Sequence, residues 1–191
     1  QMTNVDWLVS EHELKSKFGF EDAVVLNDFV AMANGATVIP DDGFQTLIPG
    51  KVNYNKSVAV LGPGTGLGIS CIVPSRVTGH PPSILATEGG HTGFAPQNEL
   101  EREILAYTAK FRDYVAAETL ICGPGMMRLY EAICQIQGET MVLKKPDEIV
   151  AAAQAGPKST ARKTVLTFCD LLGGFAGNAA LTMGAAGGVV I

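Results

Sequence analysis

The seven residues Gly62–Gly68 constrain the fold of this chain more than any other feature. They read G-P-G-T-G-L-G and lie between two short apolar segments, residues 57–61 and 69–73. Both segments are rich in aliphatic and β-branched residues, which is typical of buried strands. A strand, a glycine-rich turn and a second strand predict a hairpin whose tip carries almost no side chains.

The same run allows two interpretations. It is neither a dinucleotide fingerprint, because Leu67 stands where the third glycine is required, nor a Walker A loop, because it contains no lysine. Missing side chains would let backbone N–H groups approach a phosphate, with the hydroxyl of Thr65 as a further donor. A tight hairpin that needs positive φ at its glycines explains the run equally well.

The remaining pattern predicts an α/β fold with a mixed sheet, because strands in hairpins are followed by long helices. Residues 40–56 are rich in Pro, Gly, Asp and Asn, and we expect a loop and a domain boundary there. The other expected strands are residues 23–26, 83–86 and 187–191. The expected helices are residues 5–18 (ending at Gly19), 29–34, 99–111, 126–137, 159–183 and one that begins at Pro146.

Charge and cysteine usage exclude several classes of protein. The net charge is −5 and the longest basic cluster is the pair Lys144-Lys145, so we expect no nucleic-acid partner.

The four cysteines show no C-x-x-C spacing, which favours buried thiols in a reducing compartment over a disulfide framework or a zinc site.

Residues 171–191 carry no charge and are long enough to span a bilayer. Six glycines and Asn178 argue against a span, and we expect a buried helix that leads into a buried strand, with no membrane partner. Asp6, Glu11 and Glu13 stand where a secretory signal would need an apolar core.

Asn27 and Asp28 lie between an expected strand and an expected helix. An Asp at a helix start is a common N-cap. A carboxylate at the carboxyl end of a strand also lies where open α/β sheets place their ligands, and there Asp28 could accept a proton from a substrate hydroxyl. Both interpretations stay open.

A second polar group is formed by Glu88 and His91, which are separated by two glycines. The glycines would let a carboxylate and an imidazole approach one small polar ligand, such as a sugar. A lone histidine is more often a surface or structural residue. Glu118, just before a Gly-Pro-Gly turn, could be a helix-start acid and nothing more.

Five segments in order resemble the bacterial-type glucokinases of the hexokinase/actin-like ATPase superfamily. They are L-N-D-F (26–29), G-P-G-T-G-L-G (62–68), E-G-G-H-T-G-F-A-P (88–96), A-E-T-L-I-C-G-P-G (117–125) and G-G-F-A-G-N-A-A-L (173–181). The related ROK sugar kinases carry a cysteine-rich zinc motif after the E-G-G-H-like stretch. This chain has no such cluster, which favours the glucokinase branch.

The resemblance implies a ribonuclease H-like/actin-like ATPase fold and a role for each matching residue. Asp28 matches the general base that takes the proton of the sugar 6-hydroxyl. The matching sugar contacts are Asn27, Glu88, His91 and Glu118, with Glu118 near the anomeric end. The matching phosphate loop is Gly64, Thr65 and Gly66.

The chain also departs from the family pattern. No D-G-G-T-like phosphate loop precedes Asn27, and the sequence ends at Ile191, before the glycine pair of the adenosine site. We therefore expect a fragment, with residues 1–38 a remnant of the small domain and residues 39–191 a nearly complete large domain. The family's Mg²⁺-placing aspartate belongs to the absent loop, so no metal ligand is assigned, and we expect the isolated chain to lack turnover.

The function implied by the resemblance is ATP-dependent phosphorylation of D-glucose at the 6-hydroxyl, with Mg²⁺ held mainly through the phosphates. A kinase for another hexose and a non-catalytic sugar-binding regulator are the alternatives. Retention of Asp28 speaks against the regulator, because a sensor needs no base.

The long apolar helix and glycine-rich surfaces are consistent with a homodimer. The expected location is the cytoplasm, and an organelle such as a peroxisome-like compartment stays open.

Overall fold

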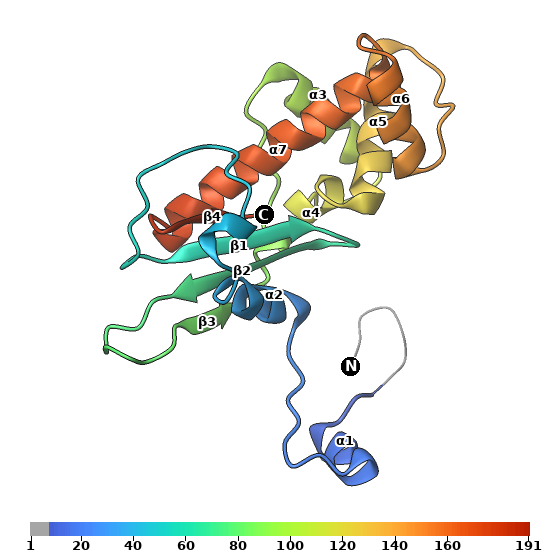
Figure 1. The fold of residues 1–191 in the computed structure, drawn as a ribbon. Helices are drawn as coiled ribbons and strands as arrows, with labels where there is room; N and C mark the ends of the chain where they lie inside the picture. The colour runs from blue at the N-terminus through green and yellow to red at the C-terminus, as the bar shows by residue number, and fades with distance from the viewer. Residues whose placement is uncertain (1–7) are drawn as a thin grey trace.

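A four-stranded mixed sheet organises the computed structural model, which describes residues 8–191 (Figure 1). The strand order is β3-β2-β1-β4. β1 (Val58–Pro63) pairs antiparallel with β2 (Leu67–Val73), which pairs antiparallel with β3 (Ser83–Ala86). β4 (Gly188–Val190) lies parallel to β1. The predicted hairpin and the predicted mixed sheet are thus both confirmed.

Helices account for about half of the remaining described chain. They are α1 (Glu11–Phe18), α2 (Asp28–Ala36), α3 (Glu99–Thr108), α4 (Ala117–Leu120), α5 (Gly123–Gln137), α6 (Pro146–Ala155) and α7 (Thr160–Met183), with short 3₁₀ turns η1 (Asp41–Gly43) and η2 (Gly89–His91). α5 begins three residues earlier than predicted. Pro124 suits the first turn of a helix, and the Sγ of Cys122 accepts the N–H of Gly125.

The segment before α2 differs most from expectation. α1 ends at Gly19 in the left-handed conformation, as predicted, but it begins at Glu11 after the N-cap Ser10, so residues 8–10 are not helical. Residues 5–7 of the predicted helix lie outside the described residues.

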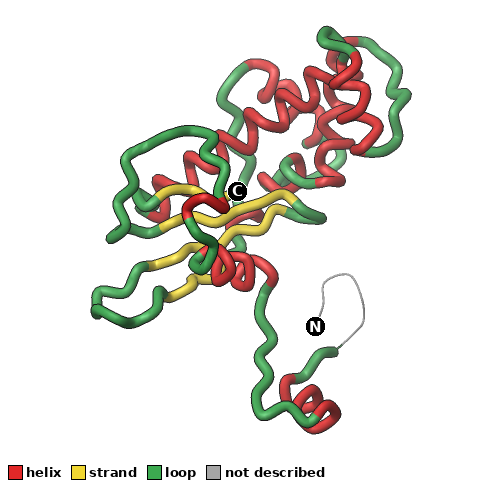
Figure 2. Tube along the Cα trace, in the orientation of Figure 1, coloured by secondary structure: helices red, strands yellow, loops and turns green. Residues whose placement is uncertain are grey.

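The predicted strand at residues 23–26 is wrong. Figure 2 shows a loop there, and Val24 is 65% exposed. A strand needs a neighbour for its backbone groups, and here the N–H of Val25 instead donates to a carboxylate oxygen of Glu11 at 2.8 Å. Residues 40–56 form the expected loop, with η1 inside it.

Helices cover both faces of the sheet. Val60 and Ile72 pack against Ala33 of α2 on one face. Leu61 and Ile69 lie an odd number of positions from Val60 and Ile72 in their strands, so they point to the other face, where they pack against α7. Figure 1 shows α2 and α7 on opposite sides of the sheet. The hairpin is therefore packed between α2 on one face and α7 on the other.

α7 joins the sheet to a helical bundle. By length and composition it could cross a membrane, but it packs against α5, α6 and β1. The largest core cluster includes Ile104, Leu129, Ile133 and Leu171 from α3, α5 and α7. α7 ends at a left-handed Gly184 and the chain continues into β4, so the expected order of helix and strand is confirmed. Neither element is buried throughout, because Leu181 of α7 and Val189 of β4 are exposed.

The cysteines only partly match the prediction of buried thiols. Cys71, Cys122 and Cys134 are buried, and Cys169 is exposed on α7. All four are free thiols. The prediction is wrong for Cys169 because cysteine spacing carries no information on which face of a helix a thiol occupies, and Cys169 lies on an exposed face of α7.

Candidate functional site

The hairpin tip is the centre around which the predicted site residues gather. Gly62 pairs with Gly68 and Pro63 with Leu67, and the N–H of Gly64 closes the turn on the carbonyl of Gly66 at 2.7 Å. Gly64 and Thr65 are exposed. Nothing lies within 4 Å of the position that a Cβ at Gly64 would take, so this side of the turn is open to a ligand.

Three of the four hairpin glycines, Gly62, Gly66 and Gly68, serve close packing and not backbone conformation. No glycine from Gly62 to Gly68 has a positive φ, so the interpretation as a turn that needs positive φ is wrong. A Cβ at Gly68 would overlap the ring of Phe29, and one at Gly62 would lie 3.3 Å from it. A Cβ at Gly66 would overlap the carboxylate of Glu118. The missing side chains make room for two residues that come from other elements.

Asn27 and Asp28 begin α2, and the structure separates their roles. Asn27 is the N-cap, because its Oδ1 accepts the N–H groups of Phe29 at 2.9 Å and Val30 at 3.2 Å. Asp28 is the first helical residue and is exposed, with one carboxylate oxygen 2.9 Å from the same Phe29 N–H. The capping role considered for Asp28 thus belongs to Asn27.

Phe29 packs the start of α2 against the hairpin. Its ring packs over Gly62 and Gly68, and its carbonyl accepts the hydroxyl of Ser70 at 2.9 Å. Ser70 is fully buried in β2. Because Asp28 directly precedes Phe29, these contacts hold the backbone of Asp28 close to the hairpin, while its carboxylate is exposed.

Glu88, His91 and Glu118 form a second polar group. His91 Nε2 lies 3.7 Å from Glu88 Oε2, and His91 Nδ1 lies 3.8 Å from Glu118 Oε1. The side chains of Glu88 and His91 are 83% and 63% exposed, whereas that of Glu118 is 32% exposed. An imidazole between two carboxylates is a set of donors and acceptors suited to a ligand with several hydroxyl groups.

Glu118 also reaches the hairpin. Its Oε2 accepts the N–H of Leu67 at 2.9 Å, across 51 positions of sequence. It lies in the first turn of α4, as a helix-start acid would, but the bond to Leu67 gives it a further role. The N–H of Gly123 donates to the carbonyl of Gly64 at 2.9 Å, so the segment that carries Glu118 is tied to the tip at a second point.

The structure thus brings the predicted residues together in two groups that share the hairpin. His91 contacts both Glu88 and Glu118, and Glu118 contacts the tip. Asn27 and Asp28 are joined to the same hairpin through Phe29. The sequence offered no signal for the positioning roles of Phe29, Leu67 and Ser70, because each depends on a contact between distant segments.

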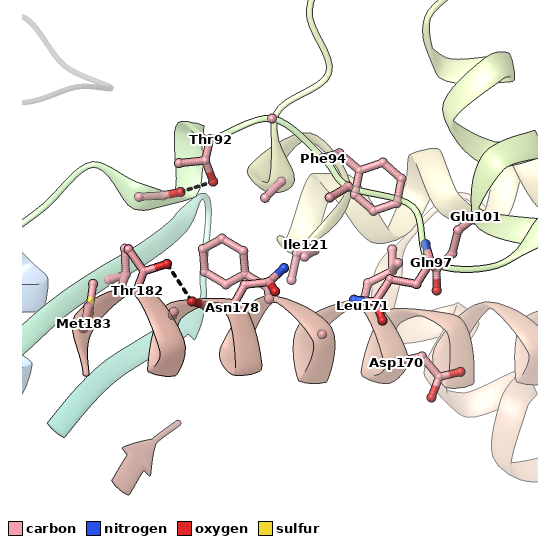
Figure 3. A pocket seen from close by; sticks show the side chains of 18 residues that line it. Thr92, Phe94, Gln97, Glu101, Ile121, Asp170, Leu171, Asn178, Thr182 and Met183 are labelled. Carbon is pink, nitrogen blue, oxygen red and sulfur yellow. Dashed lines mark hydrogen bonds between the residues drawn. The ribbon is translucent and has the colours of Figure 1, made fainter. Parts of the chain in front are cut away.

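None of these predicted residues lines the pocket that Figure 3 shows. That pocket, of about 140 Å³, lies between α7 and the segment after η2 (Figure 3). Asn178 and Thr182 line it from α7, and Phe94 and Gln97 line it from the opposite side. The predicted site is instead a partly open surface around the hairpin tip. Residues 8–191 contain no cluster of three or more metal-binding side chains.

Comparisons with known proteins agree with each other. The sequence model of the family described as Glucokinase matches residues 1–191. A glucokinase from Hahella chejuensis is 37% identical over the whole chain, and one from Marinobacter nauticus is 38% identical. The chain spans 58% of the length of each of these curated relatives.

Solved structures extend the likeness to the fold. The crystal structure of a glucokinase from an Antarctic psychrotroph matches 98% of this chain with a TM-score of 0.85 and 34% identity, and 57% of that protein is covered. A ROK family glucokinase from Streptomyces griseus, solved with glucose and AMPPNP, matches 94% of the chain with a TM-score of 0.59 and 17% identity, which covers 55% of that protein. These matches confirm the predicted α/β fold of the actin-like ATPase type.

Proposed function

Since this chain belongs to the glucokinase family, we propose that the full-length protein transfers the γ-phosphoryl group of ATP to the 6-hydroxyl of D-glucose. The observation that carries the proposal is the shared hairpin. One strand pair holds the carboxylate of Asp28 through Phe29 and the carboxylate of Glu118 through the N–H of Leu67. This arrangement supports a proposed base and a proposed sugar contact that act at one exposed glycine turn.

Asp28 is the proposed general base. Its carboxylate takes the proton of the 6-hydroxyl as that oxygen forms a bond to the γ-phosphorus. The bond from the γ-phosphorus to the bridging oxygen breaks, and ADP leaves. This reaction needs positioning and charge stabilisation and no covalent enzyme intermediate. The exposure of Asp28 at the start of a helix leaves its carboxylate accessible to a sugar hydroxyl.

The sugar is the proposed ligand of the second polar group. Glu88 and Glu118 would accept hydrogen bonds from its hydroxyls, while His91 and the amide of Asn27 would donate or accept. Glucose is present in the crystal structure of the Streptomyces griseus relative, which supports a sugar as the class of ligand.

The turn Gly64–Thr65–Gly66 is the proposed contact for the nucleotide phosphates. The N–H of Gly64 is engaged within the turn, so the Thr65 hydroxyl and the neighbouring backbone N–H groups are the donors for a phosphate. The open space beside Gly64 fits this role. Mg²⁺ would neutralise phosphate charge when bound with ATP, and no residue of this chain is assigned to it.

Two domains that close around the sugar would exclude water, which competes as phosphoryl acceptor. We propose that residues 1–38 belong to the smaller domain and residues 39–191 to the larger, with the loop at residues 40–56 following the boundary. A homodimer is compatible with this arrangement.

A substrate panel tests the proposal. The full-length protein is incubated with ATP and Mg²⁺ and with glucose, mannose, galactose, fructose or N-acetylglucosamine, and phosphorylated product is measured directly. We expect glucose to give the highest kcat/KM. Preference for another hexose would replace the substrate, and sugar binding without turnover on any of them would favour a regulatory protein.

A further inference from the structure

Glu118 joins two parts of the site through the two oxygens of one carboxylate. Oε2 accepts the backbone N–H of Leu67 in the hairpin, and Oε1 faces Nδ1 of His91. The first contact lies at 2.9 Å, within hydrogen-bonding distance, and the second at 3.8 Å is a looser charge contact. The bond to Leu67 therefore decides where the carboxylate lies.

The carboxylate can lie there only because position 66 has no side chain. A Cβ on Gly66 would overlap Oε2 of Glu118 and would come within 3.1 Å of its Cδ. The backbone of Gly66 does not have a positive φ, so it lies outside the left-handed region that favours glycine. The obstacle to a larger residue is Glu118 itself.

We propose that Gly66 is a positioning residue for sugar binding, which sets the affinity for glucose by leaving room for the carboxylate of Glu118. The inference rests on the proposed function and goes beyond it, because the resemblance places Gly66 only in the phosphate loop. On this proposal the hairpin serves both substrates. The open side at Gly64 would contact the nucleotide phosphates, and the side at Gly66 would position Glu118 for the sugar.

Gly66→Ala changes the site without requiring the backbone to move. The overlapping atoms are the end of a flexible side chain, so the Glu118 carboxylate swings away and loses the N–H of Leu67. A glucose hydroxyl then meets a carboxylate that is no longer held in place. We expect the KM for glucose to rise about ten-fold or more, as for loss of a charge-assisted hydrogen bond, while the KM for ATP changes less.

A double-mutant cycle in the full-length protein separates this role from a general effect on the loop. Glu118→Ala alone should raise the KM for glucose, and adding Gly66→Ala to it should change that KM by no more than about two-fold, the ordinary error of additivity. Gly64→Ala alters the same turn without approaching Glu118, and it should affect the KM for ATP and not that for glucose.

Two further measurements distinguish a local change at Glu118 from a general loss of folding. Gly173→Ala, on an exposed part of α7 with nothing within 4 Å of the added Cβ, should leave activity and both KM values unchanged. Hydrogen exchange of the peptide that contains the Leu67 amide should be faster in both Gly66→Ala and Glu118→Ala, which reports the lost bond without any assay of activity.

The outcomes are distinguishable from those of the proposed function. If the unsubstituted protein phosphorylates no sugar, the proposed function fails and the inference fails with it. Two results would overturn the inference alone, in a protein that phosphorylates glucose. One is that Gly66→Ala raises only the KM for ATP. The other is that Gly66→Ala raises the KM for glucose by the same factor in the Glu118→Ala background as in the unsubstituted protein.

Discussion

The ring of Phe29 occupies the space that a side chain at Gly68 would fill. This contact places the first turn of α2 against the β1–β2 hairpin, and the hydroxyl of buried Ser70 holds the carbonyl of Phe29 at 2.9 Å. Asp28 is the residue before Phe29. The position of the proposed base therefore depends on a glycine 40 residues later in the chain.

Gly68→Ala should displace Phe29 and with it Asp28. Overpacking of this kind costs about 1–3 kcal/mol of unfolding free energy. We also expect kcat for glucose to fall by about ten-fold or more, because a small misplacement of a catalytic group is costly. Steady-state kinetics and denaturant unfolding of the full-length protein measure the two effects.

The matched rescue is Gly68→Ala combined with Phe29→Leu, because the smaller, flexible leucine leaves room for the new methyl group. We expect the double variant to have a higher kcat than Gly68→Ala alone. A double variant that is no more active than Gly68→Ala would show that the ring contact does not position Asp28.

Two other glycines should respond to alanine with opposite signs. Gly125 is buried in α5, and a Cβ there would lie 2.5 Å from the carbonyl carbon and oxygen of Leu120, which are backbone atoms that cannot swing aside. Gly173 is exposed in the middle of α7 with no neighbour within 4 Å. Gly125→Ala should lower the free energy of unfolding by more than about 1 kcal/mol. Gly173→Ala should raise it by about 0.5–1 kcal/mol through helix propensity.

Urea denaturation of both variants under identical conditions measures this difference. Equal and small shifts for the two would contradict the close packing of α5 against Leu120.

The thiols should differ in reactivity. Burial raises the pKa of the Cys122 and Cys134 thiols, so at any given pH a smaller fraction of each is the reactive thiolate. Cys169 is exposed. We expect iodoacetamide at pH 8 to modify Cys169 first, while Cys122 and Cys134 react quickly only after unfolding. Because their pKa values are raised, native labelling of these two should accelerate only at a more alkaline pH than for an ordinary thiol.

Peptide mass spectrometry over a time course identifies the modified residue. Native labelling of Cys134 as fast as that of Cys169 would contradict the packing of α5.

Local patterns predicted the framework well. Two apolar segments on either side of a glycine-rich turn predicted the hairpin, and the helix predicted at residues 159–183 is α7. The strand predicted at residues 23–26 failed because β-propensity acts only where another strand is present to pair with.

The sequence was enough to propose the residues of the candidate site, but it did not predict how they are arranged. Asp28, Glu88, His91 and Glu118 were recognised from their motifs, whereas the bond from Leu67 to Glu118 crosses 51 positions. A single sequence cannot reveal such a contact. It also could not show that the hairpin glycines make room for Phe29 and Glu118, because glycine serves turns and close packing alike.

The most direct test of the account compares the full-length protein with its Asp28→Asn variant in ATP-dependent formation of glucose 6-phosphate. Asparagine keeps the shape and the exposed position of the side chain but cannot take the proton of the 6-hydroxyl. We predict that kcat falls by about a hundred-fold or more while the dissociation constant for glucose, measured by calorimetry, stays nearly unchanged. A variant as active as the unsubstituted protein would contradict the assignment of Asp28 as the base.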